Sequence, residues 1–227
     1  MKVKIKGPII SNSDAWIYEY FGIEATSPSM IDKAIEKANG EDLEVEINSG
    51  GGSVFAGSEI YTALKSYKGD VTVKIVGLAA SAASVIAMAG KKVLMSPTAQ
   101  MMIHNVSSRA AGDYREMEHT AEILKSANDT IANAYRLKTG KTQEELLRLM
   151  DNETWMTAQK AKELGFIDEI MFEDLQLAAS TSYSGLLPPE VINKIRNTVK
   201  NPAQKNKLDF LISKLNYLKL KGEKEDE

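Results

Sequence analysis

One segment of the chain, Ala79–Ala89, consists only of alanine, serine and larger apolar residues. A helix that is apolar on every side must be buried, so the fold must have layers thick enough to enclose it. Strand-like and helix-like segments alternate around it, which predicts an α/β domain with crossover connections. Strands are expected at 3–5, 15–18, 43–47, 71–76, 92–95 and 101–103, and helices at 28–39, 54–67, 79–89, 113–137 and 157–165, with a further helix that begins at Thr142.

Composition excludes several classes of function. The net charge of −3 provides no broad basic field for nucleic acid, and the absence of cysteine excludes disulfides, thiolate catalysis and cysteine-ligated metals. Two histidines without clustered carboxylates do not support a metal centre, and no cofactor is expected. Because the N-terminal stretch alternates charged and apolar residues, we do not expect a signal peptide in it, and the most apolar run, Val76–Gly90, is too short to span a bilayer. We therefore expect a cytoplasmic protein without a membrane partner.

Ser81 lies where a strand gives way to the apolar helix. A serine on such a turn projects its hydroxyl beside free backbone N–H groups, as a nucleophile requires. The alternative is that the small residues serve only for close packing, and Ser84 is assigned to packing. Three glycines, Gly50–Gly52, occupy another strand-to-helix connection, where backbone amides can bind an anion or stabilise an oxyanion. The same glycines also suit a simple turn. The segment matches neither a Walker loop nor a dinucleotide fingerprint.

Only His104 and His119 can supply an imidazole. His119 lies among glutamates in the long helix predicted at 113–137, where a solvated face explains it. His104 follows an apolar strand, so a rigid sheet would hold its side chain at a cleft, although a structural histidine is the alternative. An acid that orients the imidazole must come from elsewhere, and the candidates are Asp151 and Glu153.

Four motifs occur together and in a fixed order: Asn48-Ser-Gly-Gly-Gly-Ser-Val-x-Ala-Gly57, Gly77-x-Ala-Ala-Ser81, Met102-Ile-His104, and Glu153-x-Trp-Met-Thr-Ala followed by Ala161-Lys-Glu-Leu-Gly-Phe-Ile-Asp168. In this order the chain resembles the proteolytic subunit of the Clp protease family, over about residues 25 to 170. The resemblance implies an α/β fold, a Clp protease/crotonase-like spiral of β-β-α units with a long handle helix at 113–137.

The resemblance also implies the roles of individual residues. Ser81 would be the nucleophile and His104 the general base, and the backbone N–H groups of Gly52 and Ala82 would form the oxyanion hole. Glu153 stands where the family usually has aspartate, and Asp151 remains the alternative acid. The family's usual Ser-Pro-Gly-Gly is Ser-Gly-Gly-Gly in this chain.

At the level of the assembly, the resemblance implies stacked homo-oligomeric rings that enclose polypeptide substrates. The short segment before Ile9 leaves little room for axial loops, so the partnership with an ATP-dependent unfoldase stays open. Residues 1–175 are expected to form the peptidase domain. Residues 176–227 are expected to form a linker and a helical extension, similar to head maturation proteases of phages and prophages. The alternatives are a crotonase-like acyl-CoA enzyme and a ring-forming assembly protein that has lost its catalytic set.

Overall fold

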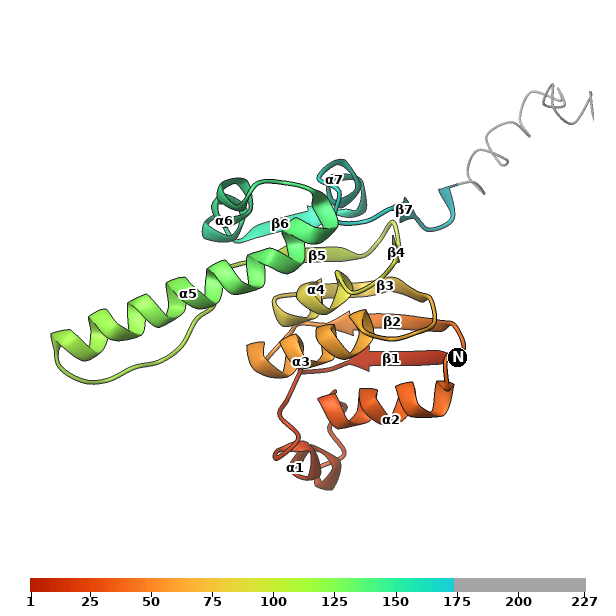
Figure 1. The fold of residues 1–227 in the computed structure, drawn as a ribbon, viewed down its shortest axis with the longest axis horizontal. Coiled ribbons are helices and arrows are strands. Elements are labelled where there is room, and N and C mark those ends of the chain that lie inside the picture. The colour runs from red at the N-terminus through yellow and green to blue at the C-terminus, as the bar shows by residue number, and fades with distance from the viewer. Residues whose placement is uncertain (174–227) are drawn as a thin grey trace, which may run out of the picture. The chain divides into compact units, whose positions relative to one another are not determined.

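The structure, a computed structural model, describes residues 1–173. Met1–Phe172 form one compact unit, and it carries all the candidate site residues. The expected linker and helical extension at 176–227 lie outside the described residues. Figure 1 shows the described unit as a twisted sheet with helices packed against it and one long helix, α5, that extends beyond the sheet.

Five parallel strands form the main sheet, in the order β1-β2-β3-β4-β7. Their bounds are Lys2–Lys6 for β1, Leu43–Ser49 for β2, Val71–Ala80 for β3, Lys92–Met95 for β4 and Glu169–Ile170 for β7. Successive residues of β1, β2 and the first half of β3 alternate between buried apolar and polar side chains. Because alternate residues of a strand face opposite sides, one face of this sheet carries the core.

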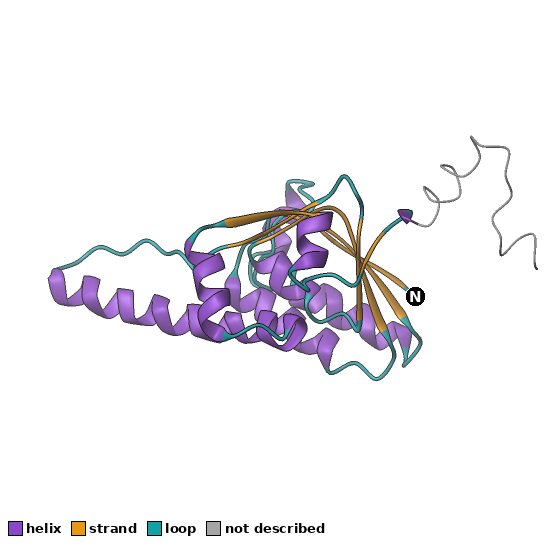
Figure 2. Ribbon diagram, turned by 90° about the horizontal axis from the view of Figure 1, so that it is seen from above, coloured by secondary structure: helices purple, strands orange, loops and turns teal. Residues whose placement is uncertain are grey.

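In Figure 2 the helices lie largely to one side of the sheet. The N-terminal helices are α1 (Ala15–Tyr20), α2 (Pro28–Ala38), α3 (Val54–Lys65) and α4 (Ala82–Ala87). The buried side chains of α2, α3 and α4 join those of the strands in one core. Every residue of α4 is buried, as its composition predicts. A Cβ at Gly57 in α3 would lie 2.9 Å from the Cβ of Ala82, so a glycine at this position lets α3 pack closely against α4.

Two further strands extend the sheet beside the last residues of β3. Strand β5 (Gln100–Ile103) pairs in parallel with the last residues of β3, and β6 (Thr154–Thr157) pairs with β5 in the antiparallel sense. The helices of this half are α5 (Tyr114–Thr139), α6 (Gln143–Asp151) and α7 (Ala158–Glu163). This alternation of strands with crossover helices, together with the long α5, agrees with the predicted α/β spiral and its handle helix.

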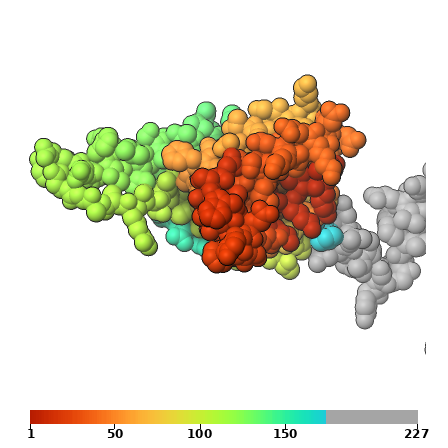
Figure 3. All heavy atoms as spheres, turned by 90° about the horizontal axis from the view of Figure 1, so that it is seen from below, coloured from red at the N-terminus to blue at the C-terminus, as the bar shows by residue number. Residues whose placement is uncertain are grey.

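Helix α5 is buried only near its C-terminal end, at Ile131, Ala132, Ala134 and Tyr135. Its N-terminal part carries exposed apolar side chains, including Tyr114 and Ile123. In Figures 1 and 3 this part, in yellow-green and green, extends past the other elements of the unit. Asp113 closes its N-terminus with a capping box to Glu116.

Several features differ from the sequence prediction. Residues Ala15–Tyr20 form a helix instead of a strand, because hydrogen bonds between Ser11 and Asp14 turn the chain just before it. Strand β3 continues through Gly77 instead of ending there. The missing side chain of Gly77 leaves room for Asn48, whose Oδ1 accepts from the Leu78 N–H at 3.1 Å.

The third difference is β6, which the sequence analysis placed partly in a polar turn. The segment is four residues long and only Met156 in it is buried, so its apolar pattern is too short to indicate a strand. Helix α4 also begins later than expected, at Ala82, because Ser81 adopts a conformation that belongs to neither a strand nor a helix.

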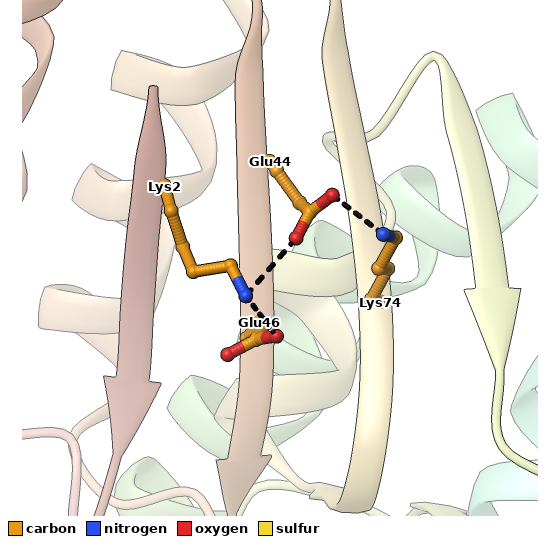
Figure 4. Close-up of polar contacts among 4 residues, drawn as sticks. All are labelled: Lys2, Glu44, Glu46 and Lys74. Carbon is orange, nitrogen blue, oxygen red and sulfur yellow. Dashed lines mark hydrogen bonds and ion pairs between the residues drawn. The ribbon is translucent and has the colours of Figure 1, made fainter.

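The polar face of the sheet carries ion pairs between neighbouring strands (Figure 4). The Lys2 ammonium lies 3.3 Å from Glu44 and 2.7 Å from Glu46, and Glu44 also pairs with Lys74. The Lys74 ammonium holds the pKa of the Glu44 carboxyl below its usual value. No helix within residues 1–173 has the length and apolar character needed to cross a bilayer.

Candidate active site

Ser81 follows directly on the last residue of β3. Its backbone has φ of 55° and ψ of −128°, a combination that is strained for a residue with a Cβ. The Ser81 N–H continues the sheet by donating to the carbonyl of Met102 in β5, at 3.0 Å. The chain therefore turns sharply at Ser81 while its neighbours are held by the sheet on one side and by buried α4 on the other.

His104 follows the last residue of β5 in the same way. Ala80 pairs with Met102 in the parallel ladder, so β3 and β5 end at the same edge of the sheet. The Nε2 of His104 lies 2.8 Å from the Oγ of Ser81, and both side chains are half-buried. The pair predicted from sequence is thus brought into hydrogen-bond contact by strand register alone.

The glycine loop between β2 and α3 packs against the Ser81 turn. A Cβ at Gly51 would lie 2.6 Å from the Ala80 carbonyl oxygen and 2.7 Å from the Ser81 Cβ. A Cβ at Gly52, whose φ is 150°, would lie 2.2 Å from the carbonyl oxygen of Ile9. Gly50 differs, because nothing lies within 4 Å of the Cβ position there. Glycine is therefore required at the second and third positions of the run and not at the first.

Two backbone N–H groups, of Gly52 and Ala82, remain available beside the serine. Within residues 1–173 neither donates a hydrogen bond, and both residues line the same small pocket as Ser81 and His104. The pocket has a volume of about 60 Å³, and its apolar walls come from Val54, Val85, Val106 and Ile131. Two unused donors beside a hydroxyl in a partly apolar pocket can stabilise an oxyanion.

Neither candidate acid contacts the imidazole. The β5–β6 ladder ends at the pair Ile103–Thr154, so His104 follows one member of its last pair and Glu153 precedes the other. Glu153 has a left-handed backbone with φ of 43°, and its carboxylate accepts from the Trp155 indole N–H at 3.2 Å. Asp151, at the end of α6, accepts instead from the Asn105 side-chain amide at 2.7 Å. Glu153 is exposed, so its carboxylate can rotate without displacing core residues.

Behind the serine lie two polar residues, of which sequence reasoning assigned Ser84 to packing and did not connect Tyr135 with the site. The Ser84 hydroxyl donates to the Ser81 carbonyl oxygen at 2.6 Å, and its oxygen lies 2.8 Å from the Tyr135 hydroxyl. Ser84 therefore forms hydrogen bonds and does not merely fill space. Tyr135 is fully buried, and this burial raises the pKa of its hydroxyl, so it stays protonated. No signal in the sequence links the two residues, because 51 positions separate them.

The described residues do not provide a set of side chains that could ligate a metal ion. Residues 1–173 contain no group of three or more histidine, aspartate or glutamate side chains placed to hold one ion. His119 is exposed on α5 and does not line the pocket that contains Ser81 and His104.

Comparison with known proteins places the chain in a family. The family model described as Clp protease matches residues 32–174, which span all four motifs from the glycine loop to Asp168. Two proteins from strains of Bacteroides fragilis, each named ATP-dependent Clp protease proteolytic subunit, are 36% identical to the chain over 136 residues. The aligned region covers 59% of this chain and 66% and 62% of the two relatives.

The chain thus spans less than two thirds of the length of the curated relatives that it matches. The match nevertheless includes the two strand ends, the glycine loop and the long helix on which the site is built. With more than half of its residues covered by the family model, this chain belongs to the Clp protease family.

Proposed function

We propose that the protein is a serine-type endopeptidase in which Ser81 is the nucleophile and His104 the general base. The observation that carries the proposal is the 2.8 Å contact between the Ser81 Oγ and the His104 Nε2, next to the unused N–H groups of Gly52 and Ala82. Hydroxyl, imidazole and oxyanion donors in one pocket are the groups that acyl transfer requires.

In the acylation step, His104 Nε2 takes the Ser81 proton while Oγ attacks the carbonyl carbon of the peptide. The carbonyl oxygen becomes negatively charged, and the N–H groups of Gly52 and Ala82 donate to it. His104 then returns the proton to the leaving amine, and the carbon–nitrogen bond breaks. Water, activated by the same imidazole, releases the acyl group and regenerates Ser81.

This cycle needs His104 with its remaining proton on Nδ1, so that Nε2 can accept. An acid beside Nδ1 selects that tautomer and stabilises the charged imidazole. Glu153 is the proposed acid, because it directly precedes Thr154, the last partner of β5 in the ladder, and because its exposed carboxylate can leave Trp155. Asp151 is the weaker candidate, since Asn105 already engages it.

The crotonase-like alternative uses two N–H donors to hold an enolate and has no use for a serine–histidine contact. The observed contact therefore favours the peptidase. The alternative of a ring-forming protein that has lost its catalytic set is supported by the positions of Asp151 and Glu153, because neither carboxylate forms a hydrogen bond with His104. Activity measurements separate these possibilities.

For the assembly, we propose homo-oligomeric stacked rings and a polypeptide substrate, as in the family. The exposed apolar side chains along α5 support a contact between copies. An ATP-dependent unfoldase partner, a capsid protein as substrate and a cytoplasmic location remain predictions from the resemblance.

Hydrolysis of an unfolded polypeptide tests the proposal. The wild-type protein should release new peptide termini, and Ser81→Ala should abolish their release while its thermal unfolding stays nearly unchanged. Ser66→Ala, at the exposed C-terminus of α3, is the matched serine control and should cleave normally. Cleavage by Ser81→Ala at the wild-type rate would exclude Ser81 as the nucleophile.

A further inference from the structure

The carbonyl oxygen of Ser81 accepts hydrogen bonds from three donors, one of which is a side chain. It accepts from the backbone N–H groups of Ser84 at 2.9 Å and Val85 at 3.3 Å, and from the Ser84 hydroxyl at 2.6 Å. Ser84 is completely buried, so this hydroxyl bond forms away from water. A buried hydrogen bond of this kind restricts the direction of the carbonyl that accepts it.

The direction of each hydrogen bond follows from counting protons. A carbonyl oxygen only accepts, so the single proton of Ser84 is used on Ser81. The contact of 2.8 Å between the Ser84 and Tyr135 hydroxyls must then be donated by Tyr135. The chain of bonds runs from the Tyr135 hydroxyl to the Ser84 hydroxyl and on to the Ser81 carbonyl.

That carbonyl belongs to the same rigid unit as a proposed oxyanion donor. The C=O of Ser81 and the N–H of Ala82 lie in one planar trans peptide group, so they point in opposite directions. Holding the carbonyl toward Ser84 therefore aims the Ala82 N–H into the pocket that contains Ser81 and His104. The strained φ of 55° at Ser81 makes such support necessary, because that conformation is otherwise unfavourable.

Tyr135 anchors the bonds to the body of the protein. It lies at the buried end of α5 and is 1% exposed, with its ring edge-on to Phe166 at a centroid distance of 5.6 Å. Its hydroxyl is thus held in place by packing before it donates to Ser84.

We propose that Ser84 and Tyr135 are positioning residues, which fix the peptide plane between Ser81 and Ala82 so that the Ala82 N–H meets the oxyanion. The inference rests on the proposed peptidase function. Neither residue needs to touch the substrate for this role. Their effect should appear in the transition state and not in substrate binding.

The test compares Tyr135→Phe, Ser84→Ala and the double variant in the full chain. Tyr135→Phe keeps the ring that packs on Phe166 and removes only the hydroxyl. We expect kcat to fall by about tenfold in Ser84→Ala and less in Tyr135→Phe, with KM unchanged. The double variant should be no slower than Ser84→Ala, because Tyr135 acts through Ser84. Affinity for a peptide boronate, which forms a tetrahedral adduct, should fall in step with kcat/KM.

Thr26→Val is the control for the loss of a buried hydroxyl. Thr26 is 2% exposed, and its side-chain hydrogen bonds go to Lys6 and not to the Ser81 turn. This variant should lose stability but keep kcat and boronate affinity per folded molecule. If Ser84→Ala fails to fold, the kcat and the boronate affinity of Tyr135→Phe alone test the inference.

Two results would overturn the inference, and they differ in what else they overturn. An active wild type whose Tyr135→Phe and Ser84→Ala variants match it in kcat and boronate affinity refutes the positioning role and leaves the peptidase intact. A folded wild type that neither cleaves peptides nor binds the boronate refutes the proposed function, and the positioning role with it.

Discussion

The Oγ of Ser81 and the Nε2 of His104 lie 2.8 Å apart, although 23 residues separate them in the chain. The contact arises because β3 and β5 run parallel and end at one edge of the sheet, with Ala80 paired to Met102. Two residues that each follow a strand end are thereby placed side by side. The glycine loop then brings its backbone against the same turn.

The glycine run offers a matched pair of variants. Gly51→Ala should reduce kcat/KM by at least about 100-fold, because the new Cβ collides with backbone at 2.6 Å and displaces the oxyanion donors. Gly50→Ala should cost little, since its Cβ meets open space. Peptide hydrolysis, with circular dichroism to confirm folding, measures both. Equal activity in the two variants would contradict this account of the loop.

Substitutions of Glu153 and Asp151 should affect activity to different extents. Glu153→Gln should lower kcat by at least about tenfold, and by up to about 10⁴ if the acid controls the tautomer of His104 as fully as in known triads. Asp151→Asn should have a smaller effect, because its carboxylate holds Asn105 and not His104. Steady-state kinetics with a peptide substrate compares them. The reverse order of effects would make Asp151 the acid.

The exposed apolar side chains of α5 predict a contact between copies of the chain. Ile123 is 54% exposed, so Ile123→Glu should leave the fold of one subunit intact and lower the mass of the assembly. Lys125→Glu adds negative charge at an exposed polar position of the same helix and serves as the control. Light scattering after size-exclusion chromatography measures the mass. An unchanged mass in Ile123→Glu would remove α5 from the interface.

Acid should weaken the ion pairs on the polar face of the sheet. The pKa of Glu44 is lowered in the folded state by Lys74, so the pair stabilises the fold above the usual glutamate pKa of 4.5, and this stabilisation is lost as the pH falls through the lowered value. Glu44→Gln should therefore shift the urea midpoint slightly downward at pH 7 and by less at pH 3. A shift of equal size at both pH values would show that Glu44 acts through packing and not through charge.

Much of the site follows from local sequence patterns. Side-chain periodicity predicts the apolar strand before His104 and the helix that is apolar on all sides, whereas it ends the strand before Ser81 too early, at Val76. The meeting of Ser81 and His104 is implied only by the resemblance, and in the structure the parallel pairing of β3 with β5 produces it. Every residue of α4 is buried, which confirms the prediction that the apolar segment forms a buried helix.

Other parts depend on tertiary contacts that no local pattern contains. Gly77 does not end β3, because the Asn48 side chain occupies the space beside it. The carboxylate of Glu153 turns to Trp155, a choice of rotamer that sequence spacing does not determine. The bond between Ser84 and Tyr135 joins two helices, so neither residue alone differs in sequence from one that only packs.

Covalent labelling of Ser81 tests the central claim most directly. After incubation with a fluorophosphonate, the intact mass of the wild-type protein should rise by one adduct per chain, and peptide mapping should place it on Ser81. His104→Ala should label far more slowly, because the hydroxyl loses its base. An assembled, folded wild-type protein that takes up no adduct, or that carries it on another residue, would contradict the account.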